Sequence, residues 1–139
     1  MRRAVWLLAI VLALPACAEE VEWRSLEVTA SAYSPSPAQT HPDHPRLTAW
    51  GDTLEPGMKA IAVSRDLIEL GLDHGTEVKI EGLSGTYVVR DKMHRRWRRK
   101  IDIYMEDAEA AREWGLRAVT IRWPVPVEAA AGDDASELR

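Results

Sequence analysis

Alternating hydrophobic and polar positions predict most of this chain as short β-strands. In residues 21–32, Leu26, Val28 and Ala30 fall on one face of an extended chain, which indicates a first strand. In residues 100–104 the alternation is strict. The same reasoning predicts further strands at residues 59–63, 76–80, 85–90 and 118–123.

Helical patterns are short and few. Residues 64–71 indicate one or two helical turns closed by Gly71, and residues 106–114 indicate a helix that ends at Gly115. Residues 33–45 contain four prolines and are expected to form a loop. Together these elements predict a mainly β fold, a six-stranded barrel with one or two short helices.

The first seventeen residues have the pattern of an export signal. Two arginines precede a short apolar run, and Pro15-Ala16-Cys17-Ala18 supplies small residues for cleavage. The run is shorter than the ~20 apolar residues that a membrane-spanning helix needs. We therefore expect export to the periplasm or cell envelope.

The single cysteine, Cys17, has two interpretations. Leu14-Pro15-Ala16-Cys17 resembles the lipobox of bacterial lipoproteins, in which the cysteine is lipidated and becomes the first residue of the mature chain. The segment Ala16-Cys17-Ala18 also fits an ordinary signal peptidase site, which would discard the cysteine. Membrane association is expected only through such a lipid anchor.

Charge and length restrict the class of protein. Removing residues 1–17 takes away Arg2 and Arg3, so 18 basic and 22 acidic residues become 16 and 22. An acidic chain argues against nucleic acid as the main partner. Its length suits one domain, which we expect to be a monomer. The expected divisions are an export signal at 1–17, a linker and strand start at 18–26, the barrel domain at 27–124 and a disordered acidic tail at 125–139.

Two aspartates flank a strongly basic segment. Asp91 ends one predicted strand and Asp102 lies inside the next, on the face opposite Ile101 and Ile103. Residues 92–100 between them carry six formal positive charges. If the two strands are neighbours, the carboxylates share a cleft, where repulsion and partial burial raise the pKa of one of them toward neutrality. A protonated carboxyl there is suited to general-acid cleavage of a glycosidic bond.

The basic segment also has functional and purely structural interpretations. Its arginines and lysines would attract the carboxylates of muropeptides, and the indole of Trp97 would pack on a sugar ring, although nucleic acid would use the same side chains. A solvated turn, with aspartates that cap or form salt bridges, is the structural alternative. The pattern His41-x-Asp43-His44 would bind a metal only weakly, so we predict neither a metal nor a cofactor. Thiol, serine-triad and nucleotide chemistries lack their motifs.

The order of motifs resembles the 3D (three-aspartate) domain, a double-psi β-barrel of bacterial cell-wall proteins that is related to the barrel of membrane-bound lytic transglycosylase A. Two departures stand out: Ser64 occupies the place of the family's first aspartate, and Asp91-Lys92-Met93-His94 replaces a glycine-rich turn. The matching segments are residues 29–33, 39–40, 47–51, 61–66, 75–78, 88–91, 101–104 and 111–115.

The resemblance implies cleavage of the bond between N-acetylmuramic acid and N-acetylglucosamine in peptidoglycan strands. It makes Asp102 the catalytic acid and base and Asp91 its supporting residue. The lytic version of the reaction leaves a 1,6-anhydro product. The substrate-binding residues expected from the groove are Tyr33, Gln39, Thr40, Thr48, Gly51, Arg65, Asp66 and Trp97.

Two other functions stay open at this point. One is a non-catalytic module that binds peptidoglycan or another polysaccharide, as in the related barrels of expansins. The other is a protein-binding lipoprotein of a wall-remodelling complex.

Overall fold

The chain folds into a closed barrel of six strands with two short helices, which confirms the mainly β barrel expected from the sequence. The computed structural model describes residues 18–36 and 43–128. In chain order the elements are β1 (Val21–Tyr33), β2 (Ala60–Val63), α1 (Arg65–Glu69), β3 (Glu77–Ile80), β4 (Tyr87–Lys92), β5 (Lys100–Tyr104), α2 (Ala108–Trp114) and β6 (Arg117–Pro126).

The strand order around the barrel mixes parallel and antiparallel neighbours. It runs β1-β5-β2-β4-β3-β6 and closes on itself. The pairs β1–β5 and β2–β4 are parallel, and the other pairs are antiparallel. As a result, β2 lies between β4 and β5, the two strands that carry the predicted catalytic aspartates.

The core is made by the inward-facing residues of all six strands and by Leu67 of α1. Ile101 and Ile103 of β5 are fully buried, as their alternation with Asp102 predicted. Burial of these branched side chains is the main stabilising contribution to a barrel of this size. The other fully buried large side chains are Val28, Ile61, Val63, Leu67, Leu72, Val78, Val89, Ile121 and Trp123.

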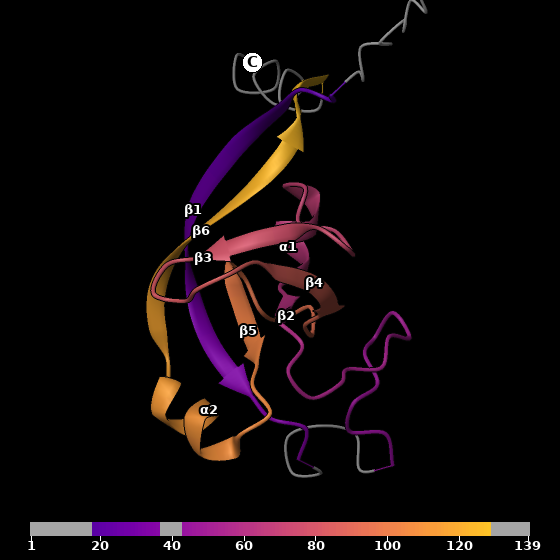
Figure 1. Cartoon of the computed structure of the whole chain (residues 1–139), viewed down its shortest axis with the longest axis vertical. Coiled ribbons are helices and arrows are strands. Elements are labelled where there is room, and N and C mark those ends of the chain that lie inside the picture. The colour runs from indigo at the N-terminus through magenta and orange to yellow at the C-terminus, as the bar shows by residue number, and fades with distance from the viewer. Residues whose placement is uncertain (1–17, 37–42, 129–139) are drawn as a thin grey trace, which may run out of the picture.

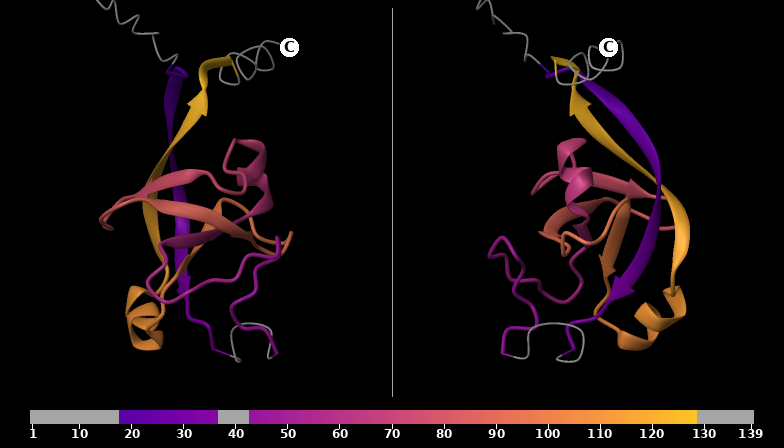
Figure 2. Two further views of the ribbon diagram at one scale, coloured as in Figure 1. Left: turned by 45° about the vertical axis from the view of Figure 1, so that its right-hand side comes forward. Right: turned by 180° about the vertical axis from the view of Figure 1, so that it is seen from behind.

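Strands β1 and β6 form a long ribbon that extends beyond the barrel (Figures 1 and 2). They are paired from Val21↔Pro126 to Ala30↔Arg117. The sequence pattern ended the last strand at residue 123, but the strand continues to Pro126. The amide of Val127 donates to the carbonyl of Glu20 on the β1 side. Successive amides along a strand point in opposite directions, so the nitrogen of Pro126 faces away from β1. On that side no backbone donor is needed for pairing with β1, and proline is therefore tolerated.

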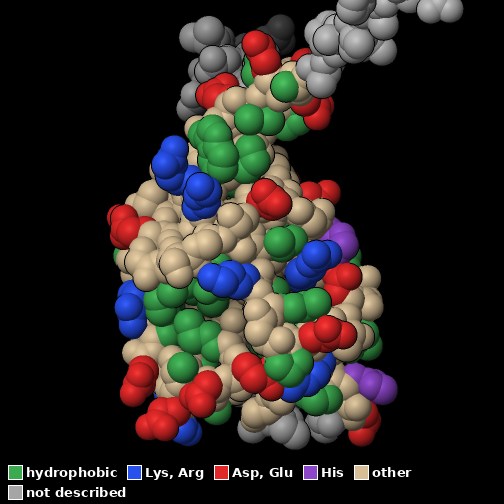
Figure 3. All heavy atoms as spheres, in the orientation of Figure 1, with side chains coloured by type: hydrophobic (Ala, Val, Ile, Leu, Met, Phe, Trp, Pro, Cys, Tyr) green, Lys and Arg blue, Asp and Glu red, His purple; other side chains and the backbone are tan. Residues whose placement is uncertain are grey.

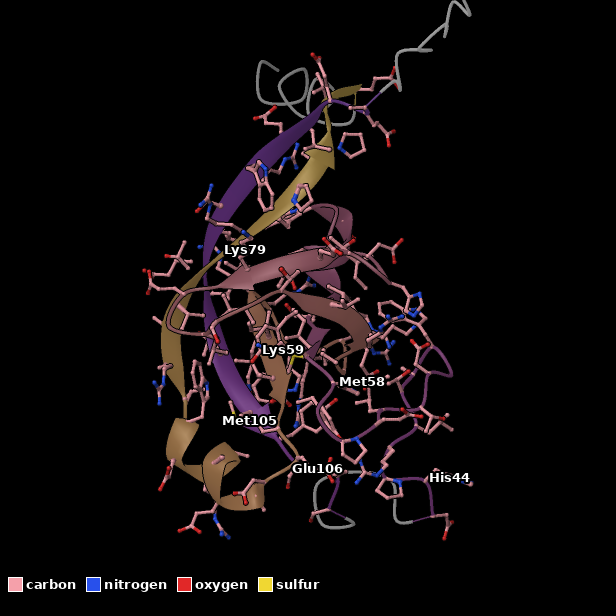
Figure 4. The ribbon with its side chains drawn as sticks, viewed as in Figure 1. His44, Met58, Lys59, Lys79, Met105 and Glu106 are labelled. Atoms are coloured by element: carbon pink, nitrogen blue, oxygen red, sulfur yellow. The ribbon has the colours of Figure 1, made fainter. Side chains whose placement is uncertain are left out.

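Hydrophobic side chains are visible along this ribbon in Figure 3. Trp23 is 46 % exposed there, with Lys79 Nζ and Arg122 Cζ each 5.7 Å from its ring centroid. Lys79 is labelled in Figure 4, close to the ribbon.

Helix α2 lies at the end of the barrel opposite the start of β1 (Figure 1). It begins after Asp107, whose carboxylate accepts a hydrogen bond of 2.8 Å from the amide of Ala110, and it ends at Gly115, with φ of 66°. Gly115 is the helix-ending residue that the sequence predicted, whereas the helix begins at Ala108, two residues later than expected. Within the described residues, no helix is long and apolar enough to cross a membrane.

Candidate functional site

Asp91 and Asp102 lie on either side of one small residue. In the barrel, Ala62 of β2 is the register partner of Asp102 on β5 and also of Asp91 on β4. Cross-strand partners point to the same face, so both carboxylates stand on the outer face of the barrel, and the side chain between them is the methyl group of Ala62. The strands are therefore not direct neighbours, yet the two carboxylates still share a cleft.

A β-bulge in β4 brings Asp91 to this face. Val89 is paired with Ile61, and Asp91 is paired with Ala62, so Arg90 is an extra residue on β4. Without the bulge, Arg90 would face Ala62 and Asp91 would point toward the core with Val89. Bulges of this kind commonly redirect a side chain beside a functional site.

Asp102 is held by a neighbour on β1. The hydroxyl of Ser31, its register partner, donates a hydrogen bond of 3.0 Å to Asp102 Oδ1. Partial burial raises the pKa of Asp102, and the charge of Asp91 adds to this effect, whereas the Ser31 hydrogen bond and the charge of Lys100 oppose it. The net direction is upward, because the effect of burial outweighs the lowering contributions.

Asp91 has a different set of partners. Its Oδ1 accepts hydrogen bonds of 2.8 Å from the amides of Ala49 and Lys92. Burial raises the pKa of Asp91 and the charge of Asp52 adds to the increase, against the lowering effect of the two amides and Lys92. The sequence predicted a raised pKa for one carboxyl of the pair, and the pKa of each is raised, mainly by burial.

Tyr33, a predicted substrate-binding residue, borders both carboxylates. It lies at the end of β1, and its ring is 5.8 Å from that of Tyr104, centroid to centroid. Burial, followed by the charges of Asp91 and Asp102, raises the pKa of Tyr33 well above its usual value. The phenol therefore keeps its proton and is a donor beside the two acids.

These residues line a groove of about 300 Å³, which we call the carboxylate groove. Ala62 forms part of its lining between the two aspartates. Such a volume suits a small ligand or one part of a larger one. The lining residues are Tyr33, Pro45, Arg46, Leu47, Leu54, Ala62, Asp91, Lys92, Met93, His94, Trp97 and Asp102.

Arg46 is a lining residue that the sequence did not single out. Its guanidinium donates to Tyr104 Oη at 2.6 Å and to both carboxylate oxygens of Glu106, at 2.9 and 2.5 Å. Figure 4 shows Glu106 beyond the end of β5, near the loop that contains His44. Arg46 thereby fixes that loop against the barrel and forms part of the groove lining. A lone arginine within a proline-rich loop gives no sequence signal of this role.

Thr48 and Gly51 do not line the groove, although both were predicted to bind substrate. They build the turn that presents the Ala49 amide to Asp91. Thr48 is buried, its Oγ1 accepts from the amide of Asp52 at 3.0 Å, and its carbonyl accepts from the amide of Gly51 at 3.0 Å. Gly51 has φ of 90°, a conformation that favours glycine.

Arg65 and Asp66 also lie outside the groove lining. Asp66 Oδ2 accepts from the amide of Arg99 at 2.9 Å, and Arg65 Nε donates to the carbonyl of Met93 at 3.3 Å. Both residues therefore hold the two ends of the basic segment, residues 92–100, which we call the cationic arm. Burial acts to raise the pKa of Asp66, but hydrogen bonds outweigh it and the net shift is downward.

Trp97, a predicted substrate-binding residue, lies in the groove lining. Its ring is already in contact with cations: Lys100 Nζ is 3.7 Å and Arg96 Cζ 4.8 Å from the centroid. Gln39, Thr40 and Cys17 lie outside the described residues. Within residues 18–36 and 43–128, no group of three His, Cys, Asp or Glu side chains is placed to hold a metal ion.

Comparison with known proteins supports the fold. No protein-family model matches the sequence, and no curated protein matches it. The structure of the Streptomyces papain inhibitor has a TM-score of 0.50 at 17 % identity, over 72 % of this chain and 94 % of that one. The likeness is one of fold.

Two expansin structures are also similar. The apo expansin of Clavibacter michiganensis has a TM-score of 0.49 at 20 % identity, over 75 % of this chain and 50 % of that one. A mutant of the same expansin in complex with cellohexaose has a TM-score of 0.45 at 17 % identity, with the same coverage. The chain thus spans half the length of these expansin structures.

Proposed function

We propose that the carboxylate groove binds a polysaccharide and cleaves a glycosidic bond, with Asp102 as the acid. The observation that carries this proposal is the placement of Asp91 and Asp102 on either side of Ala62, in one groove and with raised pKa values. Glycosidic cleavage requires a protonated carboxyl that can reach the leaving oxygen.

The surroundings of the two carboxyls suggest different roles. Asp91 accepts two backbone amide bonds, which favour its ionised form, whereas Asp102 accepts one hydroxyl bond. We therefore assign proton donation to Asp102. Asp91 supplies a negative charge that favours the protonated form of Asp102 and stabilises a developing positive charge on the sugar.

The resemblance to the 3D domain makes the muramyl bond of peptidoglycan our proposed substrate. Asp102 gives its proton to the glycosidic oxygen as the bond from that oxygen to C1 breaks. The 6-hydroxyl of the same muramyl residue then bonds to C1 and returns its proton to Asp102. The product is a 1,6-anhydro sugar, and no water is consumed. Export, with action in the cell envelope, is part of this proposal and rests on residues 1–17.

A test compares wild-type protein with Asp102→Asn on purified sacculi, with mass analysis of the soluble fragments. We expect anhydro-muropeptides from the wild type and none from the variant. Glu77→Gln, which neutralises an exposed carboxylate on β3, is the matched control and should cleave like the wild type. Equal release by wild type and Asp102→Asn contradicts the assignment of the acid.

A non-catalytic polysaccharide-binding module is the second candidate. The observation that favours it is the hydrogen bond from the Ala49 amide to Asp91, which fastens the turn at residues 48–52 to the barrel, a purely structural task. Under this alternative, wild type and Asp102→Asn bind sacculi equally and neither releases fragments. The same experiment therefore separates the two candidates.

A further inference from the structure

The cationic arm is a segregated positive surface on an otherwise acidic chain. Residues 92–100 carry six formal positive charges and no acidic residue. The side chains of His94, Arg95, Arg96, Arg98 and Arg99 are exposed. Among the described residues, none of Arg95, Arg98 and Arg99 makes an ion pair. A clustered field of this kind attracts anionic ligands even when the net charge of the protein is negative.

The backbone of the arm is fixed at both ends and in the middle. At its start, the amide of Met93 donates to the carbonyl of Val63 at 2.9 Å. In the middle, the amide of Trp97 donates to the carbonyl of His94 at 3.0 Å. At its end, the amide of Lys100 donates to the hydroxyl of Ser64 at 3.0 Å. An arm held in this way loses little conformational freedom when it binds a ligand.

The arm recognises ligands by charge more than by stacking. Lys100 and Arg96 lie over the ring of Trp97, so this indole supports two cations. A sugar or a nucleic-acid base that stacks on a cation-covered face of this ring would have to displace the cation there. This changes the sequence-based interpretation, in which the indole itself packs on a sugar.

The arm adjoins the carboxylate groove directly. Lys92, His94 and Trp97 of the arm line the groove together with Asp91 and Asp102. A polymer that enters the groove therefore passes along the arm. The negative charge of Asp91 in the groove repels a polymer that carries anionic groups on all sides. A polymer whose negative groups project to one side can instead place those groups on the arm.

We propose that the cationic arm binds the carboxylate groups of an acidic polysaccharide whose backbone enters the carboxylate groove. The part of this inference that concerns the groove rests on the proposed function. Arginine suits this ligand because its planar guanidinium pairs with a carboxylate through two hydrogen bonds. Nucleic acid fits less well, because single-strand binding normally uses exposed aromatic faces and the face of Trp97 is in contact with cations.

The test uses two probes with the same backbone, an oligogalacturonate and its methyl ester, which lacks the negative charge. We measure binding of both to the protein by calorimetry at low and moderate salt. We expect the acidic oligomer to bind at least about tenfold more tightly, with an affinity that falls as salt rises. Equal binding of the ester overturns the inference.

A matched pair of double variants locates the binding surface. The double variant Arg95→Glu with Arg98→Glu should weaken binding of the acidic oligomer by about tenfold or more. The double variant Lys79→Glu with Arg122→Glu makes the same charge change on β3 and β6 and should stay within about twofold of the wild type. A comparable loss in both variants would show that net charge, and not the arm, determines binding.

Two further outcomes are decisive. Tighter binding of a single-stranded DNA oligomer of equal charge would make the arm a nucleic-acid surface and overturn the proposal. A protein that releases nothing from sacculi but still distinguishes the acid from the ester refutes the proposed cleavage and leaves this inference standing. A protein that cleaves sacculi but binds the acidic oligomer and its methyl ester equally refutes only the inference about the cationic arm.

Discussion

Asp91 faces Asp102 across Ala62, because β2 lies between β4 and β5 and a bulge at Arg90 turns Asp91 outward. The distance between Asp91 and Asp102 along the sequence does not by itself require the two carboxylates to lie on either side of one residue. Two different strand pairings, one parallel and one antiparallel, converge on the same alanine. The size of that alanine keeps the space between the carboxylates open.

The first prediction concerns Ala62. Valine suits a strand better than alanine, so Ala62→Val should preserve the fold, while its added methyl groups narrow the groove between the aspartates. We expect a melting temperature close to that of the wild type and a large loss of fragment release from sacculi. Thr29→Val, an exposed β1 position away from the groove lining, is the control. Undiminished release by Ala62→Val would mean that the reaction takes place elsewhere.

The second prediction concerns the pH dependence of stability. The pKa of Asp102 is raised in the folded state above its reference value of 3.8, so the folded protein holds this proton more tightly than the unfolded chain. The stabilisation is complete below the unfolded pKa and is lost as pH rises through the folded pKa. Asp102→Asn should therefore flatten the decline in unfolding free energy above about pH 4. Denaturant titrations of the wild type and Asp102→Asn across pH 3–8 measure the unfolding free energy of each protein. Parallel curves of unfolding free energy against pH would contradict the prediction.

The third prediction concerns Ser31, the hydrogen-bond donor to Asp102. This bond lowers the pKa of Asp102, so Ser31→Ala should raise that pKa further and cost about 1 kcal/mol of stability. Carbon-detected NMR titration of the carboxyl group follows the change. Ser25→Ala, at an exposed position on the same strand, should leave the titration of Asp102 where it is in the wild type. An unchanged or lowered pKa in Ser31→Ala would refute the bond.

The fourth prediction concerns the turn that serves Asp91. His74 Nε2 contacts Asp52 Oδ2, and the His74 ring packs against Trp50 with centroids 5.2 Å apart. These contacts hold the turn whose Ala49 amide donates to Asp91. His74→Ala should therefore speed hydrogen exchange of the Ala49 amide severalfold. His94→Ala, on the cationic arm, is the histidine control and should leave that exchange rate unchanged.

The fifth prediction concerns the ion pair between Arg46, a groove-lining residue, and Glu106. Hydrogen bonds from Arg46 and Tyr104 lower the pKa of Glu106 to about 2. A lowered pKa stabilises the fold above the unfolded value of 4.5, and this contribution is lost as pH falls toward 2. A double-mutant cycle with Arg46→Ala and Glu106→Gln should give a favourable coupling at pH 7 that vanishes near pH 2. Because both side chains are about one-third or more exposed, the coupling should also decrease with salt.

The sequence by itself determined the elements and the two acids. Strict alternation in residues 100–104 was enough to bury Ile101 and Ile103 and to turn Asp102 outward, because side-chain direction in a strand follows a period of two. The end of α2 followed from Gly115 for an equally local reason, the capping of backbone groups. Such features depend on residues only a few positions apart.

Tertiary structure alone decided how the site is assembled. The bulge at Arg90, the position of β2 between the acids and the attachment of Ala49 to Asp91 all depend on pairings between segments distant in sequence. Long-range contacts also place Arg65 and Asp66 at the ends of the cationic arm, and not in the groove where they were expected. Arg46 likewise pairs with Glu106, a residue far from it in sequence. No local sequence pattern predicts these contacts. They depend on the strand order and register that the whole barrel must adopt in order to close.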